Sequence, residues 1–100
     1  MTLTERQKKF LRSAAHDLKP VVTVGDKGIT ATVTKELHGA LEHHELIKIK
    51  VRAGDRDVRN AAIAKLAEKA SAIIISRVGN IATLYRPRKK DPKIVLPKSG

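Results

Sequence analysis

Two glycines flank a lysine in the stretch Gly25-Asp26-Lys27-Gly28, which is the clearest candidate for chemistry in this chain. Glycine lacks a Cβ, so the backbone at these positions can come close to a partner. Lys27 adds a cation, and Thr30 can cap a helix whose first N–H groups and positive dipole end favour anions. The spacing therefore predicts a small anion clamp that suits a phosphate backbone.

The net charge points to the same kind of partner. The chain has 100 residues, 21 Lys and Arg, 10 Asp and Glu and a net charge of +11. Residues 46–100 carry 14 of the cations but only four of the acids, so the charge is concentrated in the second half. A basic excess of this size predicts a nucleic acid as partner first and an anionic membrane second.

Groups that would support catalysis or cofactor binding are missing from the sequence. There is no cysteine, so thiolate metal sites and disulfides are excluded. The phosphate-loop, dinucleotide and nucleophile-elbow patterns are also missing. His43-His44-Glu45 looks like a metal cluster, but adjacent histidines on a helix point about 100° apart. We therefore expect no enzyme, no cofactor, no metal and no small-molecule substrate.

Aromatic residues are almost absent, since only Phe10 and Tyr85 occur. Phe10 lies on an apolar helical stripe and is predicted to be in the core. Tyr85 could stack on a base, but a buried ring is the more usual state. Modules that stack several bases on aromatic platforms are therefore disfavoured, and recognition through phosphates and backbone N–H groups remains.

Neither a signal peptide nor a membrane span is expected. Residues 1–5 lack the apolar run of a secretory signal. Elsewhere no apolar stretch approaches the roughly 20 residues that cross a bilayer. We expect a soluble, cytoplasmic protein that does not engage a membrane.

Periodicity and turn signals predict three helices and four strands. Thr4 and Gln7 have capping-box spacing, and Lys19-Pro20 should end the helix that they open. Residues 46–52 alternate, which places Lys48, Lys50 and Arg52 on one face of a strand. The predicted order is a helix from residue 4, a strand at 21–24, a helix at 30–44, a strand at 46–52, a helix at 55–70, a strand at 72–75 and a returning strand at 81–86.

The sequence pattern also predicts which side chains are buried in the hydrophobic core. The apolar run Ala72–Ile75 is typical of a central strand covered on both faces. Gly39 in the second helix costs roughly 1 kcal/mol relative to alanine, which close packing against the sheet would explain. The helices should bury Phe10, Leu11, Ala14, Ala15, Leu18, Val33, Leu37, Ala40, Leu41, His44, Val58, Ala62, Ile63, Leu66, Ala67 and Ala70.

These elements predict one small α/β domain of order α-β-α-β-α-β-β. Two strand–helix–strand units should form parallel crossovers, and the hairpin at Gly79-Asn80 should add an antiparallel strand to a mixed four-stranded sheet. The expected domain covers residues 1–88. Residues 89–100 form a basic, partly flexible C-terminal tail in this interpretation.

Four runs resemble the YhbY-type bacterial proteins of the chloroplast RNA splicing and ribosome maturation (CRM) family. They are LKPVV at 18–22, VGDKGIT at 24–30, LEHHELIK at 41–48 and LYRP at 84–87, within a similarity that covers about residues 3–88. The resemblance implies a fold like the C-terminal domain of translation initiation factor three with an added N-terminal helix. It also implies RNA binding, association with large-subunit ribosomal precursors, and a functional GxxG loop at Gly25–Gly28.

The leading hypothesis is therefore a monomeric RNA-binding protein that assists large ribosomal subunit assembly, with ribosomal RNA or pre-ribosomal particles as partner. The alternatives are a DNA-binding nucleoid protein and a permanent ribosomal component. The sequence leaves open whether the lysine ladder of residues 48–52 shares a face with the GxxG loop. The predicted RNA contacts are Gly25, Asp26, Lys27, Gly28, Lys19, Lys48, Lys50, Arg52, Arg77, Arg86 and Arg88.

Overall fold

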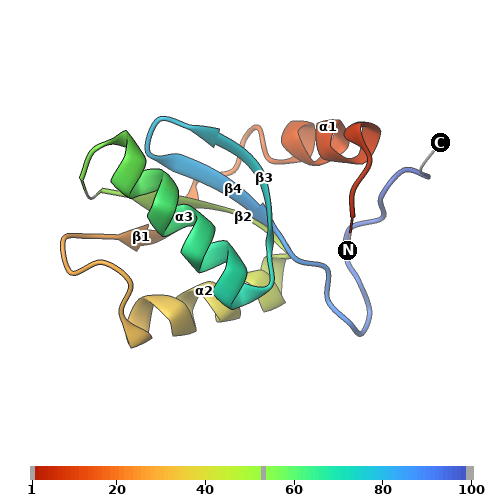
Figure 1. Ribbon diagram of the computed structural model, residues 1–100. Helices are drawn as coiled ribbons and strands as arrows, with labels where there is room; N and C mark the ends of the chain where they lie inside the picture. Colours follow the sequence, from red (N-terminus) through yellow and green to blue (C-terminus); the bar gives the residue numbers. More distant parts are fainter. Residues whose placement is uncertain (1, 53, 99–100) are drawn as a thin grey trace.

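The computed structural model describes residues 2–52 and 54–98, and it has the element order predicted from the sequence (Figure 1). Three helices and four strands alternate along the chain, with the two last strands joined as a hairpin. The elements are α1 (Glu5–Ala14), β1 (Pro20–Val24), α2 (Ala31–His44), β2 (Leu46–Val51), α3 (Arg56–Ala70), β3 (Ile73–Val78) and β4 (Ile81–Tyr85).

The sheet has the strand order β1-β2-β4-β3. β1 pairs with β2 in parallel, and β4 pairs antiparallel with both β2 and β3. It follows that β1, β2 and β3 all run in the same direction. Their carboxyl ends lie at one end of the molecule, together with the turn between β3 and β4.

The position of β3 differs from the prediction of a central strand at Ala72–Ile75. β3 is an edge strand, because the hairpin folds β4 back into the gap beside β2. The run is nevertheless covered on both faces at its start. Ile74 packs with the core under α2 and α3, whereas Ile73 and Ile75 pack under α1. Coverage, rather than a central position, explains this apolar run.

The two faces of the sheet are covered unequally. α2 and α3 lie side by side over one face, and α1 lies on the other (Figure 1). Leu11 of α1 and Ala15, the residue that follows this helix, join a small second cluster that includes Tyr85. The main core consists of Val22, Val24, Leu37, Leu41, Ile47, Ile49, Val51, Ile63, Leu66, Ala67, Ala70, Ala82 and Leu84.

The first helix is shorter and less buried than predicted. Its capping box between Thr4 and Gln7 is present as expected. However, α1 ends at Ala14, well before Lys19-Pro20. Phe10 and Leu18 are 40% and 39% exposed, so their predicted places in the core are wrong. Phe10 lies off the narrow stripe through which this short helix meets the sheet, and Leu18 falls beyond the end of the helix.

Four other predicted interior positions are also wrong. A Cβ added to Gly39 would meet no atom within 4 Å, so close packing does not explain this glycine. Val58 is 52% exposed, and Ala14 and His44 are also exposed. The chain turns sharply after His44, and the buried side chain there is that of Glu45.

Glu45 is fully buried and holds the C-terminal segment against the domain. Its carboxylate accepts hydrogen bonds from the backbone N–H groups of Arg88, Lys93 and Ile94 at 2.8, 2.6 and 2.8 Å. Its carbonyl accepts one from the N–H of Arg86 at 2.9 Å. Glu45 has φ 65°, a left-handed value that costs a non-glycine residue about 1 kcal/mol or more. Several hydrogen bonds to one buried carboxylate offset this strain.

The surroundings of Glu45 define its titration. Burial alone would raise the pKa of its carboxyl, but the three backbone N–H donors and the nearby Arg88 charge outweigh burial and lower the pKa below its usual 4.5. A carboxyl with a depressed pKa in the folded state stabilises the protein above its unfolded-state pKa. That contribution is lost as the pH falls through the folded-state value.

We predict that Glu45→Gln lowers the free energy of unfolding by about 2–3 kcal/mol at neutral pH, because a neutral amide replaces a carboxylate that accepts three N–H groups. The deficit relative to the wild type should shrink as the pH falls through the lowered folded-state pKa of Glu45, where the wild-type carboxylate also becomes protonated. Urea denaturation at several pH values measures both effects. Glu36→Gln, an exposed site on α2, is the control and should change little. A deficit that stays constant with pH would contradict this account.

Candidate nucleic-acid interface

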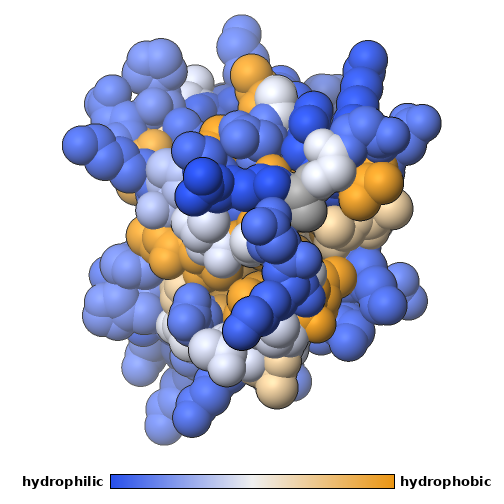
Figure 2. Space-filling view, turned by 90° about the vertical axis from the view of Figure 1, so that its left-hand side faces the viewer, coloured by the Kyte–Doolittle hydropathy of each residue, from blue (hydrophilic) through white to orange (hydrophobic). Residues whose placement is uncertain are grey.

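Three loops meet at the end of the molecule where the parallel strands finish. They are the turn Gly25–Gly28 after β1, the residues Gly54 and Asp55 before α3, and the hairpin turn Gly79-Asn80. We call this end the strand-end face. Backbone hydrogen bonds of 2.8 Å from Val51 to Asn80 and from Arg52 to Val24 hold the neighbouring segments together. Figure 2 views this end directly and shows hydrophilic side chains around smaller apolar patches.

The turn Gly25–Gly28 is a tight β-turn. The N–H of Gly28 donates to the carbonyl of Gly25 at 3.0 Å, and Gly28 has φ +72°. Glycine at position 28 is thus explained by the backbone. Gly25 has no positive φ, and a Cβ there would meet open space. Since neither strain nor packing requires glycine at position 25, its small size leaves room for a partner to approach.

The turn leads directly into the positive end of α2. Thr30 caps this helix by accepting a hydrogen bond from the N–H of Val33 at 3.1 Å. The first turn of α2 contains no acidic residue, so no side chain there offsets the helix dipole. The side chains of Asp26 and Lys27 are exposed beside it. The turn, the exposed lysine and the capped helix thus follow one another as predicted, and their binding of an anion stays a prediction.

Five cations lie on or beside the strand-end face. Lys27 and Arg52 are exposed on its β1–β2 side. Arg56, Arg59 and Arg77 line a cleft of about 420 Å³ on its β3 side. Lys27, Arg52 and Arg77 are among the contacts predicted from the sequence, whereas Arg56 and Arg59 are not. The N-cap at Asp55 was the available signal, because it places both at the start of α3, near the loops.

The lysine ladder shares a strand with this face but points elsewhere. Lys48 and Lys50 are half-buried on the side of the sheet that α1 covers in part, and Lys48 Nζ donates to the carbonyl of His16 at 3.4 Å. Only Arg52, the last residue of the ladder, reaches the strand-end face. The question left open by the sequence is thereby answered: the ladder and the GxxG loop occupy adjoining surfaces.

Lys19, Arg86 and Arg88 lie at the opposite end of the sheet. Lys19 precedes β1, and the two arginines follow β4. β1 has five residues, which at about 3.3 Å per residue separates the two ends by roughly 15 Å. These three predicted contacts therefore lie roughly 15 Å from the Gly25–Gly28 turn along the strand direction. Whether each of them touches a nucleic acid stays a prediction.

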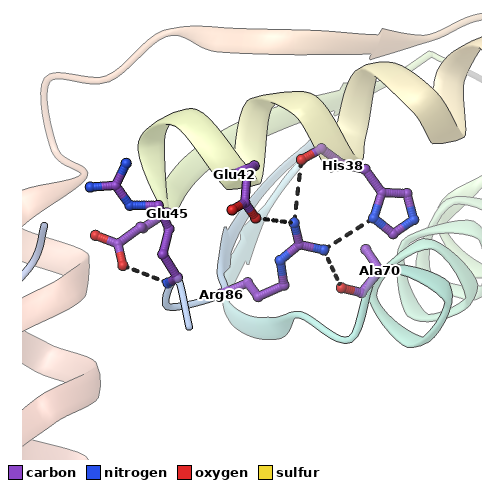
Figure 3. Close-up of polar contacts among 6 residues, drawn as sticks. His38, Glu42, Glu45, Ala70 and Arg86 are labelled. Carbon is purple, nitrogen blue, oxygen red and sulfur yellow. Dashed lines mark hydrogen bonds and ion pairs between the residues drawn. The ribbon is translucent and has the colours of Figure 1, made fainter. Parts of the chain in front are cut away.

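Arg86 has an internal role that the sequence did not indicate. Its guanidinium donates to the carbonyl of Ala70 at 2.9 Å, to His38 Nδ1 at 3.1 Å and to the His38 carbonyl at 3.3 Å. It also lies 3.4 Å from Glu42 Oε2. Figure 3 shows the side chain set between α2 and the end of α3. Arg86 therefore ties β4 to both helices.

Tyr85 is buried, as the sequence predicted, so its ring is not available for stacking. Burial, with a smaller effect from the charge of Glu45, raises the pKa of its hydroxyl. His43 and His44 lie edge to face on the helix surface. Within residues 2–52 and 54–98, no group of three or more His, Asp or Glu residues is placed to hold a metal ion. Nor is any helix in these ranges long and apolar enough to span a bilayer.

Comparison with known proteins identifies the family. The sequence profile of the CRS1/YhbY (CRM) domain matches residues 3–86. The chain belongs to the CRM domain family. Its fold also agrees with the solution structure of SAV1595 from Staphylococcus aureus, described as a candidate RNA binding protein. The TM-score is 0.81 at 32% identity, with 96% of this chain and 100% of that chain covered.

Two curated relatives of this CRM domain carry related names. An "RNA-binding protein" of Haemophilus influenzae is 42% identical over 97 residues, which is 97% of each chain. The "Probable RNA-binding protein YqeI" of Bacillus subtilis is 36% identical over 95 residues, which is 95% of this chain and 99% of that protein. The similarity therefore extends over almost the whole chain.

We predict that Arg86→Gln destabilises the fold by about 1–3 kcal/mol, because the carbonyls of His38 and Ala70 lose a charged donor. Thermal denaturation measures the loss. Arg6→Gln, at an exposed position on α1, provides the same change of charge without these bonds. Equal melting temperatures for the two variants would show that the Arg86 contacts contribute nothing.

Proposed function

We propose that this CRM domain binds RNA through its strand-end face and assists assembly of the large ribosomal subunit. The observation that carries the proposal is the exposed turn Gly25–Gly28, with Lys27 at its tip and the positive end of α2 behind it. A phosphate at this turn would meet backbone N–H groups, a lysine and a helix dipole together. The names of the similar proteins support RNA as the nucleic acid.

Recognition in this proposal depends on the backbone of the RNA. Tyr85 is buried, and the 40% exposed Phe10 lies on α1 rather than in the loops of the strand-end face, so these loops offer no ring on which bases could stack. Lysine, arginine and main-chain donors bind phosphates whatever the sequence, and they read the shape in which an RNA presents them. A protein of this kind can hold a folded precursor until later components bind. The proposal assigns it no catalytic step.

Glycine and lysine variants test the turn. We predict that Gly25→Ala and Lys27→Ala each weaken RNA binding by about tenfold, equivalent to one charge-assisted hydrogen bond, without lowering the melting temperature. The methyl group added by Gly25→Ala would stand where the RNA backbone approaches. Fluorescence anisotropy with a labelled ribosomal RNA fragment measures affinity. Gly39→Ala and Lys9→Ala, both at exposed positions, are the matched controls and should bind normally.

The salt dependence gives a second readout. If about five phosphates of a single strand are contacted, log K should fall against log[salt] with a slope near −3.5, and Lys27→Ala should remove about 0.7 of it. A slope near zero would exclude electrostatic backbone binding. Unchanged affinity in both variants would reduce the turn to a structural element.

Competition and cell fractionation separate this proposal from its rivals. A DNA-binding protein would prefer duplex DNA over ribosomal RNA fragments in a competition assay, because net charge alone favours either polymer. A permanent ribosomal component would remain on mature ribosomes after a high-salt wash. The proposal expects preference for RNA, sedimentation with large-subunit precursors and loss from washed mature ribosomes.

A further inference from the structure

An arginine-lined cleft at the β3 side of the strand-end face lies apart from the GxxG turn. It measures about 420 Å³ and lies between the first turns of α3 and the β3–β4 hairpin. Its lining is strongly basic and has one amide side chain. The lining residues are Arg56, Arg59, Asn60, Arg77 and Gly79.

A bulge in β3 gives Arg77 its direction. Ile74 pairs with Leu84 on the α3 side of the sheet, and the register then shifts by one residue before Ser76. Arg77 consequently pairs with Ala82, a residue of the main core on that same side. Strict alternation from Ile74 would have turned Arg77 to the opposite face. The bulge therefore aims this arginine into the cleft, as bulges at binding sites often do.

Arg59 carries a hydrogen-bond donor that nothing in the described structure satisfies. Its Nη1 donates to the carbonyl of Gly54 at 3.3 Å, which fixes the guanidinium near the start of α3. Its Nε is buried and has no partner among the described residues. An unsatisfied buried donor costs about 1–3 kcal/mol, so a movement of the Arg59 guanidinium that turns this N–H toward an acceptor in the cleft would be favourable.

The cleft also lacks a neutralising acid. Within the described ranges, no carboxylate lies within 4 Å of the charged nitrogens of Arg56, Arg59 or Arg77. Asp55 directly precedes α3, and its carboxylate caps the helix by accepting a hydrogen bond from the N–H of Val58 at 3.0 Å. Asp57 is exposed in the first turn. Converging guanidinium groups without a counter-charge favour an anion with several acceptor oxygens.

We propose that this cleft binds an internal phosphate of the RNA backbone, as a second contact remote from the GxxG turn. The inference rests on the proposed function and adds a geometric requirement to it. β1 and β3 lie at opposite edges of the sheet, so three interstrand spacings, about 14 Å, separate the two sites. An RNA must present two phosphates at this distance to occupy both. The volume accommodates a phosphate with its sugar rather than a bare ion.

Variants of Arg77 test the cleft with the intact chain and a labelled ribosomal RNA fragment that the wild type binds. Arg77→Gln should weaken binding about tenfold and remove about 0.7 from the salt slope. Arg77→Lys should keep the slope but not the full affinity, because lysine retains the charge and loses the planar fork. Arg6→Gln on α1 is the charge-matched control and should bind like the wild type. Removing the 5′ phosphate of the RNA should change nothing, since the occupant is internal.

An NMR signal reports on the cleft directly. The Nε–H resonance of Arg59 should shift when the RNA is added to the wild type, and this shift should be lost in Arg77→Gln while Lys27 variants retain it at saturating RNA. Arg59→Gln should also weaken binding, with circular dichroism confirming that it folds. If Lys27→Ala weakens binding but Arg77→Gln behaves like Arg6→Gln, the cleft proposal fails and the proposed function stands. If the wild type binds no RNA, both fail. Dependence on the 5′ phosphate would replace the internal site with a terminal one.

Discussion

The parallel direction of β1, β2 and β3 is the constraint on which the rest of the structure depends. Each crossover helix carries the chain back to the start of the sheet, so every parallel strand ends on the same side. The GxxG turn, the start of α3 and the hairpin turn therefore meet, although they are far apart in sequence. The same topology sets the N-termini of α2 and α3 at this end, where the dipole of α2 adds to the side-chain charge, whereas Asp55 and Asp57 offset the dipole of α3.

At the opposite end of the molecule, two charged side chains make hydrogen bonds that stabilise the fold. There Glu45, buried at the end of α2, accepts hydrogen bonds from the backbone N–H groups of residues 88, 93 and 94, and Arg86 joins β4 to two helices. Both side chains are charged, yet each makes its hydrogen bonds with the chain itself. Arg86 is thus largely satisfied within the fold, in contrast to the exposed Lys27 and Arg52 at the strand-end face.

Much of this arrangement could be predicted from local signals in the sequence. The caps at Thr4 and Thr30, the alternation of residues 46–52 and the Gly79-Asn80 turn each depend on a few neighbouring residues, and the sequence predicts each of them. The strand order, the exposure of Phe10 and the burial of Glu45 depend on contacts between distant segments, which periodicity does not contain. The same holds for the candidate site. The GxxG turn can be recognised as a sequence motif, whereas the face of the sheet on which Arg77 lies depends on a one-residue bulge in β3.

The most direct test of the account is to map which residues touch RNA. Ultraviolet crosslinking of the intact protein to ribosomal RNA, followed by mass spectrometry of the modified peptides, reads this out without any substitution. The account predicts adducts at residues 25–28, 56–59 and 77–80, on both sides of the strand-end face. Adducts confined to Lys19 and residues 86–93, at the other end of the sheet, would contradict it.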